Sequence, residues 1–154
     1  MARARPAESR ARAATATREN LGFLLAKASQ RWNELLYERF VAAGYPEVRP
    51  SYGSILLPLF EEDGLRMGEL AARARLSKQT MTTMVRLLER DGLVERRPDA
   101  SDGRASLVFL TERAHRFRPV AEASLAELDR IAVRTLTARG RNELRDALRL
   151  LANL

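Results

Sequence analysis

The sequence contains no cysteine and a single histidine, His115. Without thiols, disulfide bonds and thiol-based oxidant sensing are excluded. One histidine with no cysteine does not supply the ligands of a transition-metal cluster, so we expect no metal site. Lysine is also scarce and occurs only at Lys27 and Lys78. The basic character of this chain therefore rests on arginine.

Long hydrophobic runs are missing as well. No stretch approaches the roughly 20 apolar residues that a membrane span needs, and the N-terminal residues lack the apolar centre of a signal peptide. We therefore expect a cytoplasmic protein that does not bind a membrane. There is no glycine-rich phosphate loop and no other sign of a cofactor site. Ser77-Lys78 and His115 lack the sequence context of a catalytic triad, so we do not expect an enzyme.

The length and charge of the chain narrow the choice of partner. A chain of 154 residues fits one domain, or one compact domain with an oligomerisation appendage. Its net charge of +7 favours a polyanionic partner. Residues 1–18 carry five arginines against one glutamate, and we interpret them as a disordered basic arm. The rest is only mildly basic, so its affinity for a polyanion must come from where its charges lie.

The strongest pattern in the sequence is a helix–turn–helix followed by a hairpin, over residues 67–111. Helical periodicity starts at Met67, breaks at Arg75-Leu76 and resumes after Ser77, which is a good N-cap because its hydroxyl can accept from a free N–H. The second helix has an apolar stripe at i, i+3, i+4 and i+7 spacing, formed by Met81, Met84, Val85 and Leu88.

The opposite face of that second helix carries hydrogen-bond donors and no acid before Glu89. Such a face suits phosphate oxygens and base edges. A solvated polar face is the alternative, but the preceding helix and short turn favour a groove-reading helix. The predicted DNA-binding residues here are Ser77, Lys78, Gln79, Thr80, Thr82, Thr83 and Arg86, with Arg90 on the same face.

Two short strands with a polar loop between them predict a wing. Residues 93–97 and 105–110 read as strands, and residues 98–104 have the proline, aspartate, serine and glycine content of a loop. We expect this loop to protrude, so that Arg104 can enter a minor groove while Asp102 holds its guanidinium. The alternative is an exposed ion pair of little energetic value.

The residues from Gly68 to Thr111 resemble the MarR family of winged-helix transcriptional regulators. The likeness rests on the order and spacing of GELAARARLSKQTMTTMVRLLERDGLVERRPDASDGRASLVFLT, including the Asp-x-Arg wing signature at Asp102-Gly103-Arg104 and the closing Leu110-Thr111. The resemblance implies a homodimer that binds a pseudo-palindromic operator in double-stranded DNA, usually as a repressor, and that is often released by a small-molecule effector. Periodicity alone shows none of these three properties.

The flanks of the winged helix read as further helices. An apolar stripe runs from Leu21 to Phe40, and a shorter helix covers residues 50–60. Thr111 begins a further helical stretch with an interruption or bend near Pro119, and Thr137 is a candidate N-cap of a last helix. We therefore predict a mainly α fold with a small β-wing. Its segments are the arm at 1–18, a dimerisation helix at 19–46, the winged helix-turn-helix at 47–112 and C-terminal dimerisation helices at 113–154. Packing onto a monomeric core is the alternative for the flanking helices.

The effector site and the class of partner stay open on sequence alone. Trp32, Tyr37 and Tyr52 are candidate effector contacts, because the implied pocket would lie between the dimerisation helices and the winged helix; the favoured alternative is that each is a core residue. The rival function is a winged helix that binds protein or RNA and has no operator of its own. The acid-free helix face and Arg104 together favour duplex DNA.

Overall fold

The computed structural model describes residues 18–154. The basic arm predicted at residues 1–18 therefore lies, except for Arg18, outside the described residues. The chain divides into two compact units, one ending at Leu35 and the other running from Leu36 to Leu154. Helix α2 (Leu21–Ala42) begins in the first unit and ends in the second.

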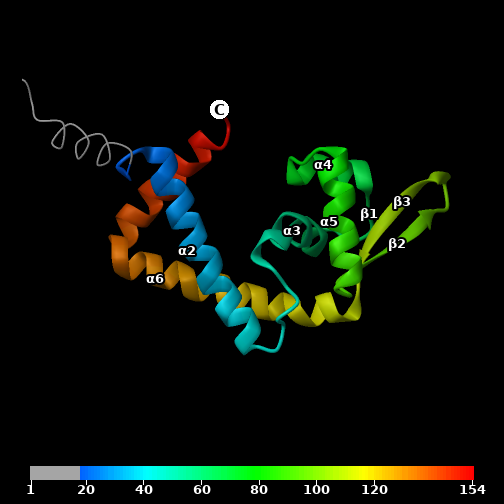
Figure 1. The fold of residues 1–154 in the computed structure, drawn as a ribbon, viewed down its shortest axis with the longest axis horizontal. Helices are drawn as coiled ribbons and strands as arrows, with labels where there is room; N and C mark the ends of the chain where they lie inside the picture. Colours follow the sequence, from blue (N-terminus) through cyan, green and yellow to red (C-terminus); the bar gives the residue numbers. More distant parts are fainter. Residues whose placement is uncertain (1–17) are drawn as a thin grey trace, which may run out of the picture. The chain divides into compact units, whose positions relative to one another are not determined.

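The second unit is mainly helical with one small sheet (Figure 1). The strands are antiparallel in the order β1-β3-β2. This confirms the predicted winged-helix fold. After α2, the elements are the 3-10 turn η1 (Pro50–Tyr52), α3 (Gly53–Glu61), β1 (Leu65–Arg66), α4 (Met67–Ala74), α5 (Lys78–Arg90), β2 (Val94–Asp99), β3 (Asp102–Leu110) and α6 (Glu112–Leu151).

Local signals set the ends of the helices as the sequence predicted. Arg75 ends α4 in the left-handed conformation at φ 53°. The Ser77 hydroxyl accepts from the backbone N–H of Thr80 at 3.1 Å, which caps α5. The Thr111 hydroxyl does the same for Ala114 at the start of α6, at 3.3 Å. These caps satisfy donors that a helix leaves free in its first turn.

The core of the second unit lies where the helices meet the sheet. Met81, Val85 and Leu88 are buried on the predicted stripe of α5, and α5 contacts both α4 and β2. On α6, the Phe117 ring packs edge-on against Phe40 with their centroids 4.9 Å apart. The apolar face of α5 is therefore used for folding, which leaves its polar face outside.

The wing differs from the prediction. The expected loop of residues 98–104 is mostly strand: β2 runs to Asp99, β3 begins at Asp102, and only Ala100 and Ser101 form the turn. Pro98 is accepted in β2 because that strand is at the edge of the sheet, where a missing N–H costs no cross-strand bond. The hairpin thus projects as a ribbon rather than as a loop (Figure 1).

Helix α6 also departs from the prediction, since it continues through Pro119. Its one non-helical residue is Thr137, at φ 67° and ψ 164°. The Thr137 hydroxyl accepts from the backbone N–H of Gly140 at 3.3 Å, so the predicted cap of the last helical segment is confirmed. The segment before Pro119 stays helical because it is packed: Ala114 and Phe117 are buried on one side of the proline and Ala121 on the other. None of the helices described has the length and apolar character needed to cross a membrane.

Candidate nucleic-acid interface

The first turn of α5 is held by its own hydroxyl groups. Ser77 Oγ accepts from the Thr80 amide and donates to Thr80 Oγ1 at 2.9 Å. Both side chains are exposed, and the predicted cap at Ser77 is confirmed. Lys78 and Gln79, which follow the cap, are exposed as well.

The middle of α5 presents two threonines and an arginine. Thr82 and Thr83 donate their hydroxyl protons to the carbonyls of Lys78 and Gln79, at 2.9 Å and 3.1 Å. Their hydroxyl oxygens and methyl groups then remain for contacts, and a threonine methyl suits the methyl group of thymine. Arg86 is exposed one turn further along.

The wing holds Arg104 in a way the sequence did not predict. Arg104 is exposed within β3, not at a loop tip. Asp102 Oδ1 accepts from the backbone N–H of Arg104 at 3.1 Å, and no ion pair joins the two side chains in the described part of the chain. The predicted carboxylate–guanidinium pair is therefore wrong here. A carboxylate two residues before a backbone N–H closes a local turn instead, which is the common behaviour of aspartate at such a position.

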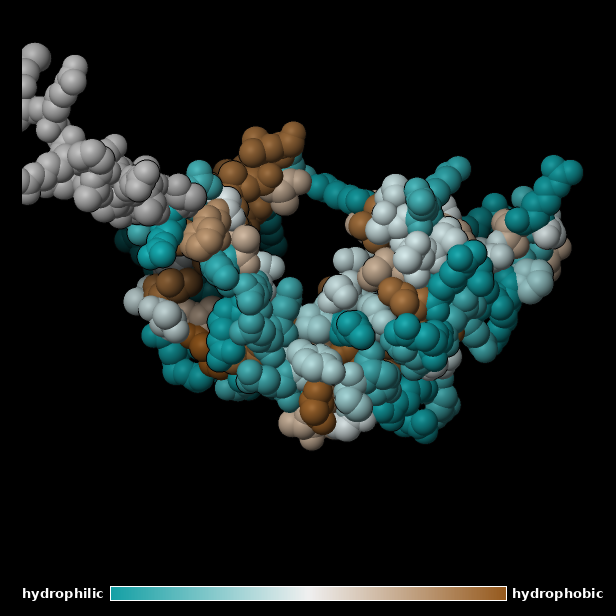
Figure 2. Space-filling model, viewed as in Figure 1, coloured by the Kyte–Doolittle hydropathy of each residue, from teal (hydrophilic) through white to brown (hydrophobic). Residues whose placement is uncertain are grey.

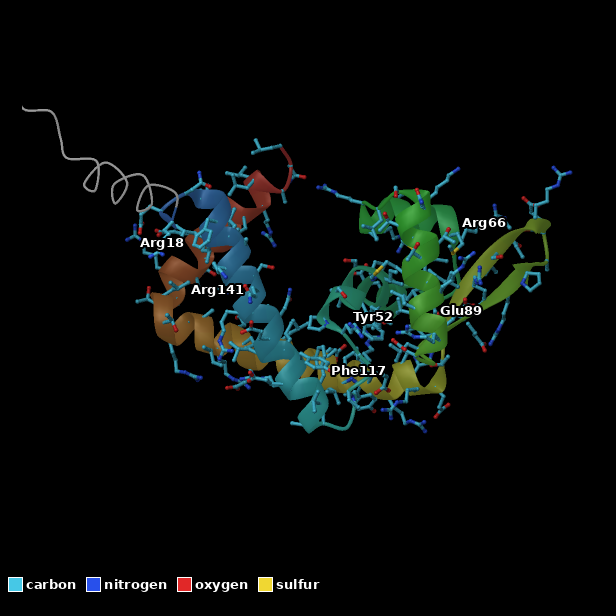
Figure 3. All side chains as sticks on the ribbon, viewed as in Figure 1. Arg18, Tyr52, Arg66, Glu89, Phe117 and Arg141 are labelled. Carbon is cyan, nitrogen blue, oxygen red and sulfur yellow. The ribbon has the colours of Figure 1, made fainter. Side chains whose placement is uncertain are left out.

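A second arginine, absent from the sequence-based set, lies beside the wing. Arg66 is labelled in Figure 3 between α5 and the hairpin. Its Nη2 lies 2.6 Å from Asp99 Oδ2 and donates to Ser101 Oγ at 3.2 Å. Hydrogen bonds from the amide and hydroxyl of Ser101, with the nearby Arg66 charge, lower the pKa of Asp99. The only sequence signal for Arg66 is its place just before a helix, where an acceptor side chain is usual.

The charges of this face are distributed unevenly. Most arginines of the second unit are paired with carboxylates, and an example on α5 itself is Glu89, which pairs with Arg96 of β2 at 2.9 Å. In contrast, Lys78, Arg86 and Arg104 are exposed and make no ion pair with any residue the structure describes. The polar face of α5 and the adjacent strand β3 therefore carry unneutralised positive charge.

The three aromatic candidates for effector binding have different surroundings. Tyr52 is only 1% exposed, and its hydroxyl donates to Asp91 Oδ2 at 2.5 Å. Burial is the main cause that raises the pKa of Tyr52. Tyr37 is 40% exposed and donates to the carbonyl of Pro46 at 2.9 Å. Trp32, in the first unit, is half-buried. In residues 18–154 no group of three or more potential metal ligands comes together.

Comparison with known proteins identifies the class to which this fold and this face belong. The model of the MarR family matches residues 50–106. The HTH-type transcriptional regulator TtmR of Methylorubrum extorquens is 36% identical over 75 residues, which are 49% of this chain and 38% of that protein. The HTH-type transcriptional repressor Mb2911 of Mycobacterium bovis is 34% identical over 95 residues, which are 62% of this chain and 68% of that protein. The chain belongs to the MarR family of transcriptional regulators.

The same likeness extends to a structure with nucleic acid. The transcriptional repressor CouR, bound to a 23-mer DNA duplex, matches with a TM-score of 0.73 and 26% identity over 87% of this chain and 93% of that one. The chain spans well under half of the length of TtmR but most of the length of CouR. Both sequence relatives are transcription regulators rather than enzymes.

Proposed function

We propose that this MarR family protein is a transcriptional repressor that binds double-stranded DNA through the polar face of α5 and the β2–β3 wing. The observation that carries the proposal is the absence of carboxylate partners, within the described residues, for exposed Lys78, Arg86 and Arg104. An arginine whose charge a carboxylate already neutralises gains less from a phosphate than an unpaired one, which only releases solvent and ions. The likeness to a DNA-bound repressor supports the same function.

Base recognition is assigned to the middle of α5. A helix in a major groove reads bases with the side chains that face away from its own core. Gln79, Thr83 and Arg86 are exposed on that side of α5, with glutamine suited to adenine and arginine to guanine. Arg104 belongs to the adjacent minor groove, where narrow width concentrates negative potential.

The protein is further proposed to act as a homodimer. The last segment of α6, residues 137–154, contains no buried side chain. Figure 2 shows hydrophobic side chains gathered at this end of α6. The exposed leucines of the segment are Leu144, Leu148, Leu150, Leu151 and Leu154. In the first unit Leu21, Phe23 and Leu24 are exposed as well. Apolar surfaces of this kind usually mark an interface, and two copies give the half-site pair that a two-fold operator needs.

A small-molecule effector is proposed as the release signal, with Trp32, Tyr37 and Tyr52 as candidate contacts. Tyr37 is the more accessible of the two tyrosines. Trp32 is the only tryptophan of the chain, so its fluorescence reports on that position alone. Titration of small aromatic compounds, which could stack on these side chains, against this fluorescence tests the proposal directly; compounds that bind should also lower the affinity for DNA.

The DNA-binding proposal is tested with the full-length protein and a short random-sequence duplex over a range of salt concentrations. Arg86→Ala and Arg104→Ala should each weaken binding, and the slope of log affinity against log salt should flatten by about 0.9 for each phosphate that the variant no longer neutralises. Arg139→Ala is the matched control, because Arg139 loses the same charge but is paired with Glu143 on α6 at 2.7 Å. Failure of the wild-type protein to bind the duplex at low salt would instead support a protein- or RNA-docking module.

A further inference from the structure

A cleft of about 510 Å³ lies between the start of α4, the start of α5 and strand β3. Three cationic side chains from three different elements reach it: Arg66, Lys78 and Arg104. The one carboxylate in its lining, that of Glu69, accepts from the backbone N–H of Arg66 at 3.2 Å. The cleft therefore carries more positive than negative charge.

Helix stability does not explain Arg66 at this position. Arg66 occupies the N-cap of α4 with φ −64° and ψ 148°. An N-cap side chain stabilises a helix by accepting hydrogen bonds, and a guanidinium has no acceptor. Serine, threonine or aspartate there would stabilise α4 more. A residue that is unfavourable for its own helix points to another role.

The wing holds the Arg66 side chain in a defined direction. Asp99, which is 8% exposed, approaches Arg66 Nη2 at 2.6 Å and is itself fixed by the amide and hydroxyl of Ser101 at 2.9 Å and 2.8 Å. Ser101 Oγ accepts from the same Nη2. Both contacts use one nitrogen, and the Arg66 side chain remains 48% exposed. The donors on Nη1 and Nε therefore stay available on a side chain that is already oriented.

We propose that this cleft binds a backbone phosphate of duplex DNA, with Arg66 donating to it and Asp99 acting as the positioning residue for Arg66. The proposal rests on the DNA-binding function proposed above and adds a contact between the recognition helix and the wing. A phosphate oxygen is a charged acceptor that can take a hydrogen bond from the Nη1 or the Nε donors that Arg66 has left. Lys78 and Arg104 neutralise the neighbouring charge. The contact carries no sequence information and serves to fix the register of the protein on the duplex.

The test compares a variant that removes the positive charge of Arg66 with variants that keep a positive charge at position 66 but lose the orientation of its hydrogen-bond donors. Arg66→Ala should flatten the salt slope on a random-sequence duplex by about 0.9 for the one phosphate it would neutralise. Arg66→Lys keeps the charge at position 66, so the slope should stay close to that of the wild type while affinity falls about two- to tenfold, as expected when one oriented hydrogen bond is removed. Asp99→Asn removes a negative charge, which alone would strengthen binding to DNA, so a fall in affinity in this variant reports the lost orientation of Arg66. Arg73→Ala is the control on the same helix, since Arg73 is paired with Glu62, and its slope should not change. Thermal melts of all four variants show whether each is folded.

The possible results separate this proposal from the broader one. If Arg66→Ala and Asp99→Asn lower the melting temperature but leave affinity and slope unchanged, the Arg66–Asp99 pair is only a structural link and the cleft is not a phosphate site. If Arg86→Ala and Arg104→Ala weaken binding while Arg66→Ala does not, the cleft proposal alone is wrong. If none of the three affects binding to the duplex, the proposed DNA interface itself is refuted.

Discussion

The hydrogen bond between Tyr52 and Asp91 joins residues 39 positions apart and should be a main support of the recognition helix. Asp91 is the C-cap of α5, where the partial negative charge of the helix end disfavours a carboxylate. The hydrogen bond from Arg90 is the chief cause that lowers the pKa of Asp91, and the Tyr52 hydroxyl lowers it further. Tyr52 is labelled to the left of α5 in Figure 3. The Asp91 side chain is only 14% exposed, so water cannot readily replace a missing partner.

Tyr52→Phe removes this one hydrogen bond and keeps the buried ring. Hydrogen bonds to charged groups contribute about 1.5–3 kcal/mol to stability, so the free energy of unfolding should fall by roughly that amount. For a chain of this size the melting temperature should fall by about 3–12 °C. Tyr37→Phe is the matched control, because Tyr37 is 40% exposed and its hydroxyl meets a neutral carbonyl. Its cost should be below about 1 kcal/mol.

The measurement is urea unfolding of the wild type and both variants. The slope of unfolding free energy against urea concentration must be the same in all three proteins, so that their midpoints can be compared. A Tyr52→Phe protein as stable as Tyr37→Phe would contradict the energetic role given to the buried bond. If Tyr52→Phe instead changed only the response to an added effector, Tyr52 would be a ligand contact and not a structural partner of Asp91.

Two further predictions concern assembly and pH. Truncation after Leu136 removes no buried side chain of the described residues, so the shortened protein should keep its helical circular dichroism yet sediment as a monomer; a full-length chain that is monomeric at micromolar concentration would defeat the dimer proposal. The pKa of Glu47 is lowered mainly by its hydrogen bond from Arg113, and that of Asp91 mainly by Arg90. A lowered folded-state pKa adds stability that is complete above the unfolded values of about 4 and disappears as the pH falls through the folded values. The unfolding free energy should thus be constant near neutral pH and fall below about pH 4. In Asp91→Asn the unfolding free energy should fall less steeply over this acidic range.

The sequence by itself determined the features that depend on near neighbours along the chain. The N-caps at Ser77 and Thr137, the helix start at Thr111, the turn at Arg75 and the buried stripe of α5 all formed as predicted. Each of these depends on a hydrogen bond within four residues or on helical periodicity, and both can be read from a short window of sequence. Those local features were also enough to predict the winged helix-turn-helix.

Only the tertiary structure decided the features that depend on residues far apart in the chain. The turn of the wing has two residues instead of the predicted seven-residue loop, because β2 pairs with β3 as far as Asp99. The partner of Asp99 proved to be Arg66, on a different strand, and that of Tyr52 proved to be Asp91, 39 positions away. Spacing in a sequence cannot choose among the many arginines and aspartates that could pair at such separations. The choice follows from how the sheet and helices pack, since packing sets which side chains come within hydrogen-bond distance.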